Sequence, residues 1–177
     1  MRVVVNSLYE LEASFLNYGQ GKIATSLEHF RNSPLVIANV ATNCKLAEKN
    51  LDSLKSLNDS YALKIGLKIL LFPSNTFNKE SRTNEEIKQY FTEKYPGTIG
   101  GSCFYISEKI SVFGNDIHPL FQYLIQQQPG MFFDSIKWNY TKFYVNMDGL
   151  VVHRMSPVGL PIRFKSTFER ILIEGKQ

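Results

Sequence analysis

Apolar residues fall in short blocks and in spaced patterns that predict alternating strands and helices. Residues 35–41 form a nearly continuous apolar run rich in β-branched side chains, which is typical of a strand buried on both faces. Over 45–62 the apolar residues recur at helical spacing and predict an amphipathic helix. A second apolar run at 67–72 ends at Pro73. Strand, helix and strand within about forty residues predict a right-handed crossover and a parallel strand pair.

The rest of the chain adds further strands and helices to this unit. Helices are predicted at 84–95, 118–125 and 162–173, and strands at 105–112, 140–145 and 150–155. Asp148-Gly149 between the last two strands is a strong hairpin signal. The segments 9–16 and 23–27 flank a glycine-containing stretch and predict an N-terminal β-hairpin. We expect one α/β domain over 1–177, a central mixed sheet with helices on both faces.

Composition narrows the class of protein. The 177 residues are 44% apolar and 20% charged, the balance of a globular domain, and the net charge of +4 is scattered, which argues against nucleic-acid binding. Two cysteines and three dispersed histidines predict neither a disulfide framework nor a metal site. No apolar run is long enough to span a bilayer, and residues 1–6 hold too short an apolar stretch for a signal peptide. We therefore expect a cytoplasmic protein, or one whose leader has been removed.

Cys44 is the strongest candidate for chemistry in this pattern. It falls between the buried strand at 35–41 and the helix at 45–62, where open α/β sheets bind ligands. The positive end of a helix dipole stabilises a thiolate, which is the nucleophilic form, and Lys45 acts in the same direction. The alternative is a small buried apolar residue, the commoner fate of a single cysteine. Spacing alone leaves both alternatives open.

Five segments of the chain match known motifs in the same order. They are residues 36–44, 72–77, 83–87, 114–121 and 136–143, the last of which reads Ile-Lys-Trp-Asn-Tyr-Thr-Lys-Phe. Together they resemble the glutathione peroxidase family along nearly the whole chain. The resemblance implies a thioredoxin-like fold and the reduction of hydroperoxides through a cysteine or selenocysteine.

The resemblance also implies the site residues. The family uses a tetrad of cysteine or selenocysteine, glutamine, tryptophan and asparagine, which assigns Cys44, Trp138 and Asn139 as catalytic residues. Indole and amide N–H groups can stabilise a thiolate, so Trp138 and Asn139 are expected within reach of the Cys44 sulfur. The alternative is that Trp138 is a core aromatic residue and Asn139 caps a strand edge.

The glutamine of the tetrad is absent from this chain. The loop that carries it in the family is one residue shorter here, so that counting from Phe77 places Glu80 at the glutamine position, whereas counting back from Thr83 deletes it. A carboxylate beside a thiolate is unfavourable. We expect Lys79 and Arg82 to draw Glu80 toward solvent, away from the sulfur.

The reductant depends on the second cysteine. Thioredoxin-dependent members of the family carry a resolving cysteine at the position of 91–95, which holds none here. Cys103 comes later and is either a displaced resolving residue or a buried thiol. Without a resolving cysteine, the resemblance implies glutathione as an external co-substrate, with thioredoxin or a disulfide isomerase as alternatives, and no other cofactor.

The segment 125–136 lacks the long loop that builds the tetramer in some family members. We therefore expect a monomer with an open site that accepts bulky lipid or protein substrates. Lys45, Lys137 and Lys142 are candidates for a basic lip that binds glutathione carboxylates or phospholipid headgroups at a membrane surface, or else they are solvated surface lysines. The expected activity is a thiol-dependent peroxidase. The alternative is a weakly active or non-catalytic member acting as a redox sensor, protein-disulfide oxidant or binding module.

Overall fold

The computed structural model describes residues 5–16, 23–99, 103–130 and 134–164. Its centre is a five-stranded sheet with the strand order β5-β4-β3-β6-β7. The strands are β3 (Leu35–Val40), β4 (Lys68–Pro73), β5 (Phe104–Ile106), β6 (Lys142–Val145) and β7 (Val151–Met155). β3, β4 and β5 are parallel, while β6 is antiparallel to both of its neighbours. The predicted α/β class and mixed sheet are confirmed.

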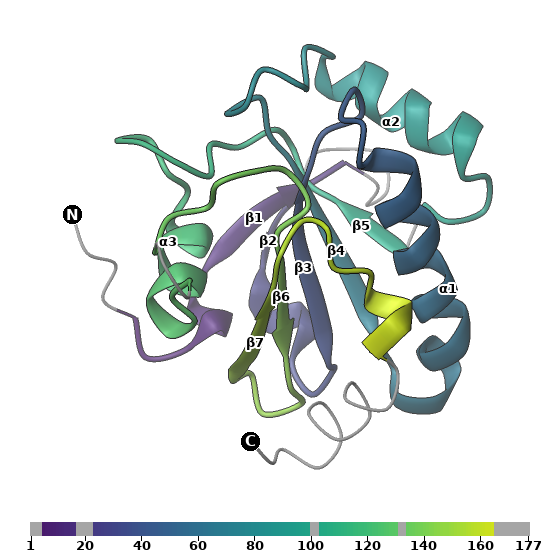
Figure 1. Cartoon of the computed structure of the whole chain (residues 1–177). Helices are drawn as coiled ribbons and strands as arrows, with labels where there is room; N and C mark the ends of the chain where they lie inside the picture. Colours follow the sequence, from purple (N-terminus) through teal and green to yellow (C-terminus); the bar gives the residue numbers. More distant parts are fainter. Residues whose placement is uncertain (1–4, 17–22, 100–102, 131–133, 165–177) are drawn as a thin grey trace.

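The sheet is covered on both faces (Figure 1). Along β3, Val36, Ala38 and Val40 pack in one cluster with the helices α1 (Ala47–Ile65) and α2 (Asn84–Lys94). Leu35 and Ile37 pack in a second cluster with α3 (Pro119–Gln127) and the antiparallel hairpin of β1 (Glu12–Phe15) and β2 (Ile23–Ser26). Burial of both faces explains the nearly continuous apolar pattern of β3.

Local capping signals define the helices. The side chain of Thr83 accepts from the backbone N–H of Glu86, and the Glu86 carboxylate accepts from that of Thr83, a capping box that starts α2. Gly66, with a φ of 70°, ends α1. The short 3₁₀ helices η1 (Leu8–Glu10), η2 (Leu27–Phe30) and η3 (Pro161–Phe164) complete the described elements.

Two predicted elements differ from the structure. The strand expected at 105–112 ends at Ile106, and beyond it the Glu108 N–H donates to the Ser14 carbonyl of β1 at 2.8 Å, while the Ile110 N–H donates to the Pro73 carbonyl of β4 at 2.9 Å. Of the helix expected at 162–173, residues 162–164 lie in a 3₁₀ helix, and residues 165–173 lie outside the described residues.

Candidate functional site

Cys44 lies in the turn that joins the carboxyl end of β3 to α1. Its backbone N–H donates to the Ala41 carbonyl at 3.3 Å, and its own carbonyl accepts from the Ala47 N–H at 2.9 Å. The side chain is 8% exposed. Cys44 is therefore held directly before the first turn of α1, at the sheet edge where α/β proteins bind ligands.

A second turn, residues 138–141, is anchored to the same end of β3. Asn39 makes three of its hydrogen bonds: its side-chain amide donates to the Trp138 carbonyl at 3.3 Å and accepts from the Thr141 N–H at 3.1 Å. Its backbone carbonyl accepts from the Tyr140 N–H at 2.7 Å. The fully buried Asn39 thus brings the Trp138–Asn139 pair, nearly a hundred residues away in sequence, to the end of the strand that leads to Cys44.

Tyr140 connects the two turns. It adopts a positive φ of 69°, which explains why β6 starts at Lys142 instead of residue 140 as predicted. Its hydroxyl donates to the Ala41 carbonyl at 2.9 Å, inside the Cys44 turn. Burial holds the Tyr140 pKa well above its ordinary value, and the neighbouring Tyr90, Cys44 and Glu80 also influence it. The phenol is therefore a neutral donor packed beneath the cysteine turn.

Asn139 carries an unusual buried amide. The side chain is fully buried, and neither its oxygen nor its nitrogen has a hydrogen-bond partner among the described residues. A buried amide without partners costs about 1–3 kcal/mol, so such groups are rare in native proteins and often have a functional role. This orphan amide is the clearest sign of a ligand site near Cys44.

Trp138 lies at the surface beside Phe77. Its side chain is 41% exposed, and the two rings are 5.5 Å apart between centroids with an interplanar angle of 35°. In the described part of the chain, neither Trp138 nor Asn139 donates a hydrogen bond to the Cys44 sulfur. Hydrogen bonds from Asn39 and Tyr140 bring the turn that carries Trp138 and Asn139 to the end of β3 that leads to Cys44.

Glu80 departs from its prediction. Instead of turning toward solvent, its side chain is completely buried. The carboxylate accepts from the backbone N–H of Thr42 at 2.6 Å and from the Thr42 hydroxyl at 2.8 Å. Since Thr42 lies two residues before Cys44, Glu80 holds the cysteine turn from below, and no hydrogen bond joins it to the sulfur among the described residues. Two strong donors keep it buried.

Lys142 does not belong to a basic lip, contrary to prediction. It is fully buried, and its Nζ donates to Asn50 Oδ1 and the Gly159 carbonyl, both at 2.7 Å, and to the Pro157 carbonyl at 3.4 Å. Because β6 points this side chain under α1, Lys142 ties the helix to the segment after β7. Lys45 and Lys137 are exposed, as a substrate lip requires.

A pocket beside Lys137 is lined partly by residues that the sequence did not mark as candidates for a site. It has a volume of about 630 Å³, and its lining includes Lys137, Thr141, His153 and Arg154. The Arg154 guanidinium donates to the carbonyls of residues 128, 134 and 135. It also lies 5.4 Å from the Phe143 ring centroid. No periodicity or motif marked Arg154, because its contacts arise only when the fold brings β7 against residues 128, 134 and 135.

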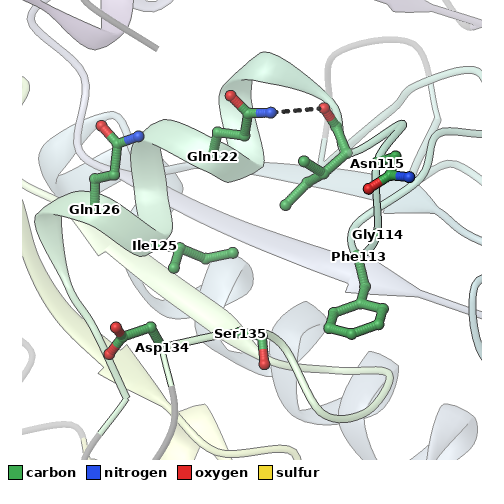
Figure 2. Close-up of a pocket in the computed structure, with 9 residues that line it drawn as sticks. Phe113, Gly114, Asn115, Gln122, Ile125, Gln126, Asp134 and Ser135 are labelled. Atoms are coloured by element: carbon green, nitrogen blue, oxygen red, sulfur yellow. Dashed lines mark hydrogen bonds between the residues drawn. The ribbon is translucent and has the colours of Figure 1, made fainter. Parts of the chain in front are cut away.

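A separate groove lies along α3 and contains none of the predicted site residues (Figure 2). It measures about 730 Å³ and is formed by the loop at 113–117, by Gln122, Ile125 and Gln126 of α3, and by residues 134–135. Among the described residues that line this groove, Asp134 is the only charged one.

Cys103 lies at the opposite end of the sheet from Cys44. Phe104 of β5 pairs with Ile69, which pairs with Val36, so Cys103 lies level with the amino end of β3. Cys44 follows the carboxyl end, roughly 15 Å away at about 3.3 Å per residue. A disulfide needs Cα atoms within about 7 Å. Burial also raises the Cys103 pKa to about 12, which keeps it a thiol.

No group of three or more histidine, cysteine or acidic side chains among the described residues is arranged to hold a metal ion. Nor is any helix in this part of the chain long and apolar enough to cross a bilayer.

The sheet joins a parallel β3–α1–β4 unit to the antiparallel pair β6–β7, and a cysteine lies just before α1. This arrangement defines a thioredoxin-like redox protein. Comparison with known proteins narrows this class. Residues 8–125 match the family model of glutathione peroxidase. The chain is 38% identical to the glutathione peroxidase homolog BsaA of Halalkalibacterium halodurans, covering 94% of this chain and 99% of that protein.

Two more comparisons agree. A protein of Encephalitozoon cuniculi, named as a probable phospholipid hydroperoxide glutathione peroxidase, is 42% identical over 75% of this chain and 73% of its own length. The crystal structure of T. cruzi GPX1 superimposes with a TM-score of 0.72 at 25% identity, covering 94% of this chain and 97% of that one. The chain belongs to the glutathione peroxidase family and is a thiol-dependent peroxidase that acts on hydroperoxides.

Proposed function

We propose that Cys44 is the peroxidatic residue and that Asn139 and Trp138 assist it. The observation that carries this proposal is the orphan amide of Asn139, which is buried in a turn anchored beside Cys44. A buried donor with no protein partner is available to a sulfur anion or a peroxide oxygen. The partly exposed indole of Trp138 offers a second N–H donor at the rim.

In the first half of the cycle the Cys44 thiolate attacks one peroxide oxygen. An S–O bond forms, the O–O bond breaks, and the leaving alkoxide takes a proton to become water or an alcohol. Cys44 is oxidised to a sulfenic acid while the peroxide is reduced. N–H donors lower the barrier when they stabilise the negative charge that moves onto the departing oxygen.

Glu80 does not replace the missing glutamine in this step. An ionised carboxylate only accepts hydrogen bonds, and both acceptor oxygens are already used by Thr42. The donors must therefore come from Asn139, Trp138 and the backbone at the start of α1. Donors of this kind support thiolate chemistry at Cys44.

In the second half an external thiol restores Cys44, since Cys103 lies at the other end of the sheet. The thiol displaces water from the sulfenic acid to form a mixed disulfide, and a second thiol releases Cys44 and leaves as a disulfide. We propose glutathione as this reductant, with thioredoxin or a disulfide isomerase as the competing candidates. Electrons pass only between sulfur and oxygen, so the proposed cycle uses no cofactor.

The proposed substrates include lipid hydroperoxides, and the proposed active form is a monomer. The ring pair of Phe77 and Trp138 forms an apolar rim, and the pocket with Lys137 and Arg154 offers positive charge to a phosphate headgroup. The name of the Encephalitozoon cuniculi relative agrees with such a substrate. Peripheral contact with a membrane surface follows from the same residues.

The experiment measures peroxide consumption by the purified protein with glutathione or with thioredoxin and its reductase. We expect turnover with glutathione, abolished in Cys44→Ser and retained in Cys103→Ser. Turnover with thioredoxin alone, lost in Cys103→Ser, would overturn the proposed external-thiol cycle. A chain that oxidises a disulfide isomerase with peroxide but ignores glutathione would favour the protein-disulfide oxidant instead.

A further inference from the structure

A chain of hydrogen bonds links a buried carboxylate to a guanidinium beneath the cysteine turn. The Thr42 hydroxyl donates to Glu80 at 2.8 Å and accepts from the Arg82 Nη1. Arg82 Nη1 also donates to Asn43 Oδ1 at 2.8 Å. Thr42 and Asn43 are the two residues that precede Cys44. Both ends of this chain therefore act on the segment that presents the sulfur.

The carboxylate at one end has no direct ion-pair partner. Among the described residues no lysine, arginine or histidine nitrogen lies within 4.0 Å of Glu80, although its side chain is fully buried. A buried charge is tolerated only when it is compensated. The nearest compensating charge in the hydrogen-bond chain is Arg82, one hydroxyl group away, so the guanidinium balances the carboxylate through Thr42.

Packing holds the guanidinium in place. Arg82 is half-buried, and its guanidinium carbon lies 5.2 Å from the ring centroid of Tyr90 on α2. The cation–π contact and the two hydrogen bonds from Nη1 define its position from two sides. The loop is also fixed through its backbone, because the Lys79 carbonyl accepts from the Asn43 N–H at 3.2 Å.

The ionisable groups around Cys44 come from several elements. Lys45 belongs to the cysteine turn, Glu80 and Arg82 bond to it from the loop after β4, and the Tyr140 hydroxyl donates to it. Tyr90 on α2 contacts Arg82. Burial keeps Tyr140 neutral at ordinary pH. Lys45 is exposed and screened by solvent. Glu80 and Arg82 are consequently the two charges whose balance bears most directly on a thiolate at position 44.

We propose that Arg82 is a positioning residue of the peroxidase site, which holds the Thr42–Asn43 turn and balances the buried charge of Glu80. This inference rests on the proposed role of Cys44. Loss of the guanidinium leaves the cysteine thiolate facing an uncompensated carboxylate.

The test uses Arg82→Met, Glu80→Gln and the double variant, with Lys79→Met as a matched loss of an exposed cation in the same loop. The rate of Cys44 alkylation by iodoacetamide, and the rate of hydrogen peroxide reduction, are measured from pH 5 to 9 in a Cys103→Ser background. For Arg82→Met we expect a roughly tenfold lower rate at pH 7 and a half-maximal rate at higher pH. Arg82→Lys should recover part of this loss.

The double variant decides between charge balance and simple loss of packing. If Glu80 and Arg82 compensate each other, removing both charges returns the pH of the half-maximal rate toward that of the parent protein. A double variant as impaired as Arg82→Met, or an Arg82→Met profile identical to that of Lys79→Met, would overturn the proposal. Should Arg82→Met fail to fold, Glu80→Gln alone must move the half-maximal rate to lower pH. The rate of Cys44 alkylation depends on the charges of Glu80 and Arg82 even if peroxide turnover is absent. Failure of this proposal can therefore be distinguished from failure of the proposed function.

Discussion

The two ends of the central sheet carry one cysteine each, and the contrast between them shows what makes a thiol useful. Both side chains are buried and both belong to the cluster beneath α1. Cys44 follows the carboxyl end of β3, where two turns, an orphan amide and an exposed indole meet. Cys103 precedes β5 at the amino end, where Lys55 and Asp59 near the middle of α1 influence it.

The difference lies in the surroundings of each thiol. At the Cys103 end, burial is the main influence, and it raises the thiol pKa to about 12, with Asp59 acting in the same direction. No catalytic partner is close to it in the described part of the chain. At the Cys44 end the backbone leaves the carboxyl end of β3, the edge at which open α/β sheets bind ligands. Equal burial thus produces an inert thiol in one place and a candidate nucleophile in the other.

The largest difference between the two cysteines is expected when each thiol is replaced by a hydroxyl. Cys44→Ser should lower peroxide turnover by at least about a thousandfold, because the nucleophile of the proposed cycle is lost. Cys103→Ser should retain turnover within about twofold, apart from any loss of stability. Peroxide consumption with glutathione measures both. Equal losses in the two variants would show that the ends of the sheet cooperate.

Asn139→Ala tests whether the orphan amide serves the reaction instead of the fold. Turnover should fall by about 10- to 100-fold, the effect of removing one hydrogen bond to a charged group. The free energy of unfolding should not fall through lost hydrogen bonds, because the amide makes none with the described protein. Asn39→Ala is the matched control, since that amide makes two bonds and its loss should destabilise the protein. Urea denaturation and peroxide turnover separate the two outcomes.

The pH dependence of alkylation sharpens the contrast further. Cys103 remains a thiol up to about pH 12 in the folded protein, so iodoacetamide should label Cys44 alone between pH 7 and 9. The raised pKa contributes stability that is complete below the ordinary thiol pKa of 9.0 and is lost as pH rises toward 12. Peptide mapping by mass spectrometry follows the labelling. Rapid labelling of Cys103 at pH 8 would contradict its assignment as buried and inert.

The smallest expected effect concerns Lys142, a buried charge that joins α1 to the segment after β7. Burial lowers its pKa to about 7 from 10.5, so the unfolded chain binds more protons between these values. Stability should therefore rise with pH across this window, by at most about 1.4 kcal/mol per pH unit. Lys142→Met should lack this rise in urea denaturation from pH 6 to 9. An identical pH dependence in both proteins would mean that its three oxygen acceptors keep the ammonium charged throughout.

Much of the fold follows from local patterns. The apolar run of β3, the helical spacing of α1, the capping box of α2 and the Asp-Gly hairpin are each encoded within a few residues. Hydrophobic periodicity reports which face of an element is buried, and β3 is apolar throughout because both of its faces are covered. Cys44 could be singled out for the same reason, since the strand–helix junction is a local feature.

The partners of Cys44 could be assigned only by family resemblance or by tertiary structure. Asn39 brings Trp138 and Asn139 to the end of β3 through hydrogen bonds that span about a hundred residues of sequence, and no periodicity encodes such a contact. The positions of Glu80 and Lys142 were misjudged because charged residues usually face solvent. Here specific donors and acceptors from distant segments compensate their burial. Local sequence therefore determined the elements and the reactive junction, while the tertiary structure decided which polar groups surround it, because burial of a charge depends on partners that only the folded chain assembles.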